Sequence, residues 1–503
     1  MVSINLRSIS TLIGVFLLHA IIGTIHTFPS LSKYFFSYLI ELNQETFTHE
    51  FIELYLYLLN STLNIFLPIG VILIQKNYLN SSVIIGISLL LKLIVTASFI
   101  FFPQFHIILI ALLIESIVCG LAYMPGLICV WKYFPNYKGF VTGIALDGFG
   151  VTRMMYKYIA IYLINSNDIP PLPMRDRYPK EINENFKSFL KKSEIFFSFL
   201  SALTVFLIYP FEVQKEEEKF KLILLKKTKS IQKLSKAVNK RKIHSYSSSN
   251  LQNIVSDEDN IVTFLSSYIK DESDSSSDNE KKTGIKNKKN ESIRSLITSQ
   301  PFLQLTFIFF FSMMFCSIEL FIIKKLGKMH RHSEETISNG TLLWKIVNAS
   351  CFPLWGYLID KFRFKNLFIG ILILEIGISS CCYFICSYKW GYLLYTFLGA
   401  IVNSANLAIS PAVYAIIFGS ERGAFLFSIS SNLFNTYYFL RPFINNFVTV
   451  RIYYLFFYLI ITFSAVLSLI ILCFFVEKPY IDKETNNLPY MELDEFDATD
   501  TDV

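Results

Sequence analysis

Three basic side chains lie well inside long apolar stretches of the sequence: Arg153, Lys345 and Arg441. On insertion scales, a charge at the centre of a membrane helix costs about 2.5–3.5 kcal/mol, so each of these residues needs a compensating role. Fixed positive charge in such a place suits an anionic solute, because the bound anion neutralises the charge. We therefore predict that all three bind substrate. The alternative for each is snorkelling to the membrane surface or a structural ion pair.

Acidic residues and histidines in other apolar stretches could carry a proton. We predict Glu319, Glu115 and His19 as proton-coupling residues, because a buried carboxyl can bind a proton and histidine titrates near neutrality. His26 lies seven residues after His19 and shares its helix face, so we predict that it contacts substrate. A hydrogen-bonded packing histidine is the open alternative for both.

Amide and carboxylate side chains within apolar stretches have other roles in this interpretation. Asn403 and Asn406 could orient a polar substrate. Asp147 lies two turns into its stretch, which favours a gating or helix-packing role over substrate contact.

The composition indicates that these stretches cross a membrane. The chain has 503 residues, of which 53% are hydrophobic and 17% charged, whereas a soluble domain is about a quarter charged. Apolar runs of about 20 residues are long enough to cross the hydrocarbon core, and only helices satisfy their own backbone there. We therefore predict an all-α polytopic membrane protein with twelve spans. The spans lie near residues 9–31, 51–75, 82–102, 105–130, 138–164, 193–211, 300–324, 337–359, 366–386, 390–418, 422–446 and 450–476.

The spans divide six and six around a polar segment. Residues 1–211 form the predicted first bundle and residues 300–477 the second. Residues 212–299 are charged and of low complexity, which predicts a disordered loop, and residues 478–503 form an acidic tail.

Several classes of function find no support in the sequence. The basic clusters lack the interleaved aromatic residues of a nucleic-acid site, and no CxxC pair or His/Cys cluster suggests a metal. The sequence has no phosphate-binding loop of the type found in ATP-driven pumps. A membrane acyltransferase would need an acidic or asparagine partner beside a histidine, and no such motif is present. We expect no cofactor and no enzymatic activity.

One loop carries a family signature. Gly356, Asp360, Lys361, Arg363 and Lys365 form the pattern GxxxDKxRxK after the eighth span. This resembles the loop signature of the major facilitator superfamily, in which the glycine permits close helix approach and the charges hold the loop by breakable pairs. The family's second glycine is Phe362 here. The first-half copy is reduced to a segment from Gly70 to Lys76 that lacks the aspartate.

A second motif resembles one branch of that superfamily, the monocarboxylate and oxalate/formate porters. It lies between the fourth and fifth spans and reads WKYFPNYKGFVTG. The matching residues are Trp131, Phe134, Pro135, Lys138, Gly139 and Gly143. The monocarboxylate branch also has an arginine before the Pro-x-x-Gly of the eighth span, where this chain has Phe352.

The resemblance implies a fold of two six-helix bundles, with spans 1, 4, 7 and 10 at a central cavity and spans 3, 6, 9 and 12 outside. It implies a monomeric secondary transporter in a lipid bilayer, moving a small monocarboxylate-like anion by alternating access coupled to protons. Lys138, Gly139 and the loop signature would then gate the cytoplasmic side. Lys92 and Glu375, in outer spans, would form structural pairs.

Alternatives remain open for the solute and for the role of the protein. The solute could be a vitamin acid such as pantothenate, an amino acid or a drug-like amine, and the intramembrane carboxylates would then matter more than the bases. A transporter-like sensor is a further alternative. We expect both termini and the central loop to be cytoplasmic, in the plasma membrane or an organelle membrane.

Overall fold

The computed structural model describes residues 6–42, 49–102, 104–172, 177–211, 293–434, 436–437 and 451–477. Contacts divide the chain into one unit of Met1–Phe211 with Ser299–Val503 and another of Glu212–Thr298. In the second unit, the short helix α10 (Ile293–Ile297) lies among the described residues. The predicted disordered loop and acidic tail lie almost entirely outside them, so both remain predictions.

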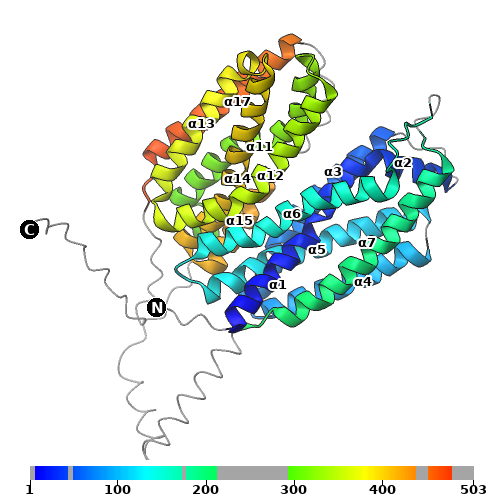
Figure 1. Ribbon diagram of the computed structural model, residues 1–503. Helices are drawn as coiled ribbons and strands as arrows, with labels where there is room; N and C mark the ends of the chain where they lie inside the picture. The colour runs from blue at the N-terminus through cyan, green and yellow to red at the C-terminus, as the bar shows by residue number, and fades with distance from the viewer. Residues whose placement is uncertain are drawn as a thin grey trace, which may run out of the picture. The chain divides into compact units, whose positions relative to one another are not determined.

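Twelve helices of 15 residues or more are present within the described part of the chain, one for each predicted span (Figure 1). The N-terminal bundle comprises α1 (Leu6–Gly23), α3 (His49–Gln75), α4 (Ser81–Phe101), α5 (Phe105–Tyr133), α6 (Lys138–Ile164) and α7 (Lys180–Leu207). The C-terminal bundle comprises α11 (Gln300–Met329), α12 (Glu334–Lys361), α13 (Phe364–Ile385), α14 (Lys389–Phe418), α15 (Ser420–Phe434) and α17 (Arg451–Phe474). Two shorter helices, η1 (Ile25–Leu31) and α2 (Ser32–Glu41), follow α1. The predicted all-α fold is confirmed.

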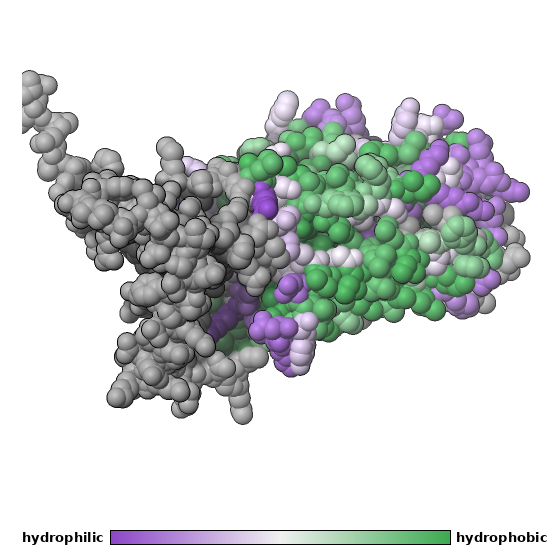
Figure 2. Space-filling model, turned by 90° about the horizontal axis from the view of Figure 1, so that it is seen from below, coloured by the Kyte–Doolittle hydropathy of each residue, from purple (hydrophilic) through white to green (hydrophobic). Residues whose placement is uncertain are grey.

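Eight of the helices in the described residues are long and apolar enough to cross a membrane by length and composition. The helix α6 does not qualify by these measures, since it carries Lys138, Asp147 and Arg153 within a single helix. Large apolar side chains such as Phe206 and Leu459 lie exposed on the outer surface. Figure 2 shows hydrophobic side chains over most of one face and hydrophilic ones gathered toward its ends. This distribution fits a protein surrounded by lipid.

Each bundle is held by contacts both between consecutive helices and between helices that are distant in sequence. In the N-terminal bundle α5 packs on α3 and α4, and α1 packs on α6 and α7. In the C-terminal bundle α14 packs on α12 and α15, and α17 packs on α11 and α13. Contacts between the bundles join α6 to α12 and α14, and α3 to α15. The predicted gating residues lie along these last contacts.

Candidate functional site

The helices α6 and α12 approach each other backbone to backbone. A Cβ atom at Gly139 would overlap the carbonyl oxygen of Gly356, and one at Gly143 would lie 2.8 Å from the Cα atom of Pro353. No side chain larger than hydrogen fits at either glycine, which is how small residues allow membrane helices to pack closely. We call this contact the α6–α12 seam. It brings together Gly139 and Gly356, which the sequence placed in two separate motifs.

A carboxylate closes one end of the seam. Asp360, at the end of α12, accepts hydrogen bonds from the backbone N–H groups of Gly139 at 2.8 Å and Phe140 at 2.7 Å. These groups belong to the first turn of α6, where N–H groups lack helical partners and the helix dipole favours negative charge. Lys138 donates to the carbonyl oxygen of Ala415 at 2.9 Å, near the end of α14. Three helix ends from the two bundles therefore meet through Asp360 and Lys138.

The remaining bases of the loop signature lie beside this contact or within the C-terminal bundle. The Nζ atom of Lys361 lies 5.8 Å from the ring centroid of Tyr357, and the side chain of Arg363 is exposed where α13 begins. Lys365 donates to the carbonyl oxygen of Cys473 at 2.6 Å, at the end of α17.

A second carboxylate caps a helix in the same manner but inside one bundle. Glu477 accepts from the backbone N–H of Phe364 at 3.0 Å and of Lys365 at 3.2 Å, at the start of α13. Asp360 and Glu477 therefore both accept hydrogen bonds from the first N–H groups of a helix. Asp360 joins helices of different bundles, whereas Glu477 joins two helices of the C-terminal bundle.

The second contact between the bundles, which we call the α3–α15 seam, is built from different groups. Gln75, at the end of α3, donates to the backbone carbonyl of Glu421 at 3.0 Å. Lys132 forms an ion pair with the Glu421 carboxylate at 2.8 Å, and the two side chains are 21% and 40% exposed. Gln75 belongs to the first-half copy of the loop signature, in which the aspartate is missing.

Three predicted substrate-binding bases lie against rings of α6 that span about two and a half turns, from Phe149 to Tyr158. The rings of His26 and Phe149 are 4.5 Å apart, and the guanidinium of Arg153 lies 5.4 Å from the Phe149 centroid. Lys345 of α12 lies 5.2 Å from the ring centroid of Tyr158, across the seam. Arg153 and Tyr158 are five residues apart, about 7.5 Å along the helix axis. We call His26, Arg153 and Lys345 the basic cluster.

Two other predicted residues cannot be placed in this way. Arg441 lies outside the described residues. Glu319 belongs to α11, but its side chain is not among those described. Both remain predictions, for substrate binding and for proton coupling respectively.

Phe352 occupies the position at which the monocarboxylate branch has an arginine, and its side chain packs in an apolar cluster. Phe352 is 1% exposed and packs with Leu146 of α6 and Ala408 of α14 in one apolar cluster. Because these three residues come from both bundles, Phe352 contributes an apolar contact to the seam.

Two buried acidic residues of the N-terminal bundle share a basic partner. Glu115 of α5 forms a buried ion pair with Lys92 of α4, and the buried Glu194 of α7 lies within electrostatic range of the same lysine. Proton coupling by Glu115 remains a prediction, while the ion pair provides a structural reason for this residue. Within the described residues, His19 is fully buried, its Nδ1 contacts the Val15 carbonyl at 2.8 Å, and its Nε2 has no hydrogen-bond partner.

The C-terminal bundle holds a network of amides and hydroxyls. Asn348 of α12 donates to the Asn403 side chain at 3.2 Å, and Asn403 donates to the Cys316 carbonyl at 3.2 Å. Ser312 of α11 lies 2.8 Å from Oδ1 of Asn406 and 2.7 Å from Oε2 of Glu375. The amides of Asn403 and Asn406 therefore bond within their own bundle, and substrate contact by either remains a prediction.

Asp147 lies on α6 between the two glycines that face α12, Gly143 and Gly150. Its side chain is half-buried, and its Oδ1 atom is buried without a hydrogen-bond partner in the described part of the protein. Asp147 thus lies along the seam, where the described residues offer no hydrogen-bond partner for that oxygen, and its gating or packing role remains a prediction. No group of three or more His, Cys, Asp or Glu side chains among the described residues is placed to hold a metal ion.

Sequence reasoning missed several polar residues of these contacts: Gln75, Ser312, Asn348, Glu421 and Glu477. Serine, asparagine and glutamine inside apolar runs are common, and nothing local distinguishes those that join helices. Glu421 and Glu477 lie at helix ends, where their charge gives no signal of the helix they contact.

The fold is that of major facilitator transporters. The proton:xylose symporter XylE has a TM-score of 0.62 with 14% identity over 94% of this chain and 96% of its own. The transporter FucP in its outward conformation has a TM-score of 0.58 with 12% identity, over 93% of this chain and 98% of its own. A variant of FucP, the Escherichia coli fucose:proton symporter, gives 0.55 with 12% identity and the same coverage. No protein-family model and no curated protein matches the sequence.

Proposed function

We propose that this protein is a secondary transporter that moves a small organic anion across a membrane by alternating access, coupled to protons. The fold supports the transporter part of this proposal, because the likeness to XylE and to FucP extends over more than nine-tenths of this chain. Carriers of this kind work by rocking one bundle against the other around a site between them. The anion and the proton are carried by the residues below.

The basic cluster is the observation that carries the proposal of an anion. His26 and Arg153 come from the N-terminal bundle and Lys345 from the C-terminal bundle, and their ring partners span about two and a half turns of α6. An anion bound among them would contact both bundles at once. Binding would then stabilise the conformation in which the bundles are closest, which is the coupling that a carrier requires. Arg441, predicted from the sequence, would add a fourth base.

The α6–α12 seam supplies the moving contact in this proposal. Its Asp360 cap is made of two hydrogen bonds from backbone groups, which can break and reform without any change in covalent structure. We assign this end of the helices to the cytoplasm, together with both termini, as in the sequence interpretation. The seam is closed here, and in the proposed cycle this state would be open on the opposite side, as FucP is in its outward conformation.

Uptake into proteoliposomes tests the proposal. Purified protein is reconstituted and a panel of labelled monocarboxylates, dicarboxylates, sugars, amino acids and amines is offered with and without a proton gradient. We expect saturable uptake of one class of anion that rises with the gradient. Uptake confined to neutral sugars or cations would contradict the anion assignment, and no uptake by correctly folded protein would contradict transport.

A variant of the basic cluster sharpens the same experiment. Arg153→Gln removes a charged hydrogen-bond donor worth about 1.5–3 kcal/mol, so the Michaelis constant for the anion should rise roughly tenfold or more. Arg153→Lys should restore part of the affinity, because lysine cannot bind a carboxylate bidentately. Lys192→Gln, which removes an exposed base on α7, is the matched control and should leave the constant unchanged. Equal constants for Arg153→Gln and Lys192→Gln would assign the arginine to structure.

A carrier for an amine or amino acid is the second candidate, and Asp147 favours it. Its Oδ1 atom is buried without a hydrogen-bond partner in the described region, so it could accept a bond from an ammonium group. The panel separates the two candidates, since this one predicts uptake of amines that Asp147→Asn abolishes. In the anion proposal, Asp147→Asn should alter the rate of uptake and leave the selectivity unchanged.

A further inference from the structure

The acid Glu375 lies in a chemical environment unlike that of any other acid in the described structure. Its side chain is fully buried on α13, and it is the one buried acidic or basic residue between residues 293 and 477 of the described chain. Burying an isolated carboxylate in such a place carries a large desolvation cost unless a cation pairs with it. By contrast, Glu115 in the N-terminal bundle has Lys92 as its partner.

The groups that surround Glu375 are neutral. Ser312 reaches it from α11, and Asn406 from α14 bonds to that serine. One turn along α13, Ser379 accepts from Thr462 of α17 at 2.9 Å. The ionisable groups buried on these helices in the described residues are thiols and phenols, among them Cys316, Cys382, Tyr395, Tyr414 and Tyr458. None of them carries a positive charge that could stabilise a carboxylate.

The hydrogen bonds around Ser312 favour a protonated carboxyl at Glu375. Its hydroxyl lies between two acceptor oxygens, Oε2 of Glu375 at 2.7 Å and Oδ1 of Asn406 at 2.8 Å, but it has one hydrogen to donate. The Asn406 amide donates from Nδ2 to the carbonyl of Val402 at 3.3 Å, and its side chain also lies within hydrogen-bonding reach of the Glu375 carboxyl. With a proton on Glu375, the carboxyl donates to Ser312 and Ser312 donates to Asn406, so both short contacts contain a hydrogen. If the carboxylate were ionised, Ser312 could donate to one of the two oxygens, and the other short contact would contain no hydrogen.

The Glu375 cluster is also connected to the α6–α12 seam. Asn406 lies two residues before Ala408 on α14, and Ala408 packs with Leu146 of α6 and Phe352 of α12. If α14 shifts against α11 and α13 when the seam opens, the contact between Asn406 and Ser312 changes with it. The other carboxyl oxygen, Oε1, is buried and has no hydrogen-bond partner in the described structure, so it is ready to take a water molecule if the helices separate.

We propose that Glu375 is the acid that carries the proton of the transport cycle, which rests on the proposed function of a proton-coupled carrier. The carboxyl is protonated while the seam is closed. When the bundles move and water reaches Oε1, the O–H bond of the carboxyl breaks, its electron pair stays on the carboxylate, and the proton passes to water. Rebinding of a proton from the other side of the membrane allows the cluster to close again.

Difference infrared spectroscopy of the reconstituted full-length protein tests proton binding without any substrate. We expect a carbonyl band of a protonated carboxylic acid that shifts in heavy water, falls as pH is raised and is missing in Glu375→Gln. Ser312→Ala keeps the acid but removes its hydrogen-bond partner, so the band should move to higher frequency. A spectrum in which Glu375→Gln removes no such band at any pH overturns the proposal. If Glu375→Gln does not fold, a carbonyl band that keeps its frequency in Ser312→Ala overturns the proposal.

Transport then tests the role of that proton. We expect Glu375→Gln to keep exchange of labelled for unlabelled anion and to lose accumulation driven by a proton gradient, while Glu375→Asp keeps part of it. Normal gradient-driven accumulation by Glu375→Gln overturns the proposal even if the band is present. If the proposed function of anion transport is wrong, the result differs from these outcomes. The wild-type protein then transports no anion but still shows the titrating carboxyl band, so Glu375 binds a proton without that function.

Discussion

The two contacts between the bundles occupy corresponding places and are built from unlike chemistry. At the α6–α12 seam, the carboxylate of Asp360 caps the first turn of a helix from the other bundle, and glycines bring the backbones together. At the α3–α15 seam, Gln75 donates to one carbonyl, and Lys132 pairs with a half-exposed glutamate. A buried backbone contact depends on shape, whereas an exposed ion pair is screened by water and salt.

This difference indicates a division of labour between the seams. A Cβ atom at Gly70, in the first-half copy of the signature, would overlap the Leu121 carbonyl of α5, so that glycine serves packing inside its own bundle. Gly356 instead faces α6 of the other bundle. We infer that the α6–α12 seam sets the balance between conformations and that the α3–α15 seam adjusts it weakly. The following substitutions test that ranking.

The largest effect is expected from Gly143→Leu. The new side chain would meet the backbone of Phe352 and Pro353, which cannot move aside as a flexible side chain would. Overpacking of this kind costs about 1–3 kcal/mol, enough to shift the balance between conformations roughly 5–150-fold. Uptake by reconstituted protein should therefore be almost lost.

Gly377→Leu is the matched control for this prediction. A Cβ atom at Gly377, on the outer side of α13, has nothing within 4 Å, so the same substitution should leave uptake near the wild-type rate. Equal uptake by Gly143→Leu and Gly377→Leu, at equal amounts of folded protein, would show that close approach at the seam is not needed for transport.

A smaller effect is expected from Asp360→Asn, which keeps the shape of the cap and removes its charge. A carboxylate at a partly buried helix N-terminus contributes up to about 2 kcal/mol, so the open seam should become roughly 5–30-fold more populated. The measurement is the rate at which a maleimide labels Ile359→Cys in a chain without other cysteines. Ile359 is 5% exposed in the closed seam, so labelling reports opening.

Two further variants serve as comparisons for the labelling rate of Asp360→Asn. Glu477→Gln removes an equivalent cap inside the C-terminal bundle, so it should lower thermal stability without raising the labelling rate.

Lys132→Gln breaks the exposed ion pair of the other seam, which is worth less than about 1 kcal/mol, and should raise labelling less than fivefold. If Lys132→Gln opened the seam as much as Asp360→Asn, the proposed ranking of the two seams would be wrong.

The fold could be predicted from the sequence because a run of about 20 apolar residues specifies a membrane helix without reference to its neighbours. The partners of charged residues could not, since each depends on the packing of distant helices. Asp360 was recognised from its motif, yet nothing in that motif names the first turn of α6 as its partner. Lys92 and Glu375 are both isolated ionisable residues in outer spans. Only the structure separates an ion pair with Glu115 from a carboxyl bound to a hydroxyl.

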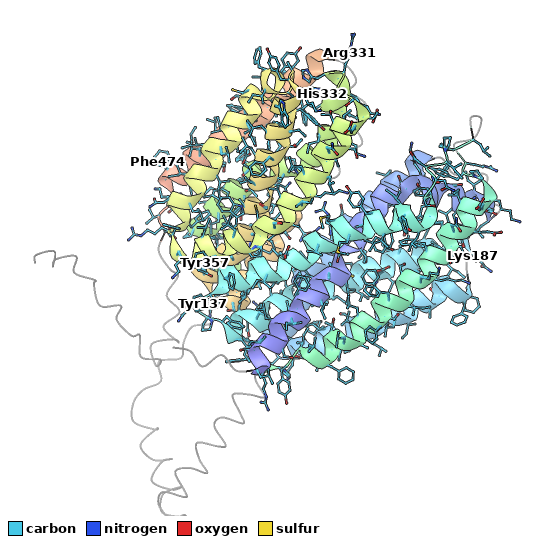
Figure 3. All side chains as sticks on the ribbon, viewed as in Figure 1. Tyr137, Lys187, Arg331, His332, Tyr357 and Phe474 are labelled. Carbon is cyan, nitrogen blue, oxygen red and sulfur yellow. The ribbon has the colours of Figure 1, made fainter. Side chains whose placement is uncertain are left out.

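The central claim is that the α6–α12 seam opens when the opposite ends of the bundles close, and paired distance measurements test it most directly. Spin labels at Tyr137 and Tyr357, both exposed beside the Asp360 cap, report one end (Figure 3). Labels at Lys187 of α7 and at Arg331, between α11 and α12, report the other. On adding the transported anion at low pH, we expect the Tyr137–Tyr357 distance to lengthen as the Lys187–Arg331 distance shortens. Two distances that stay fixed, or that change in the same direction, would contradict alternating access at this seam.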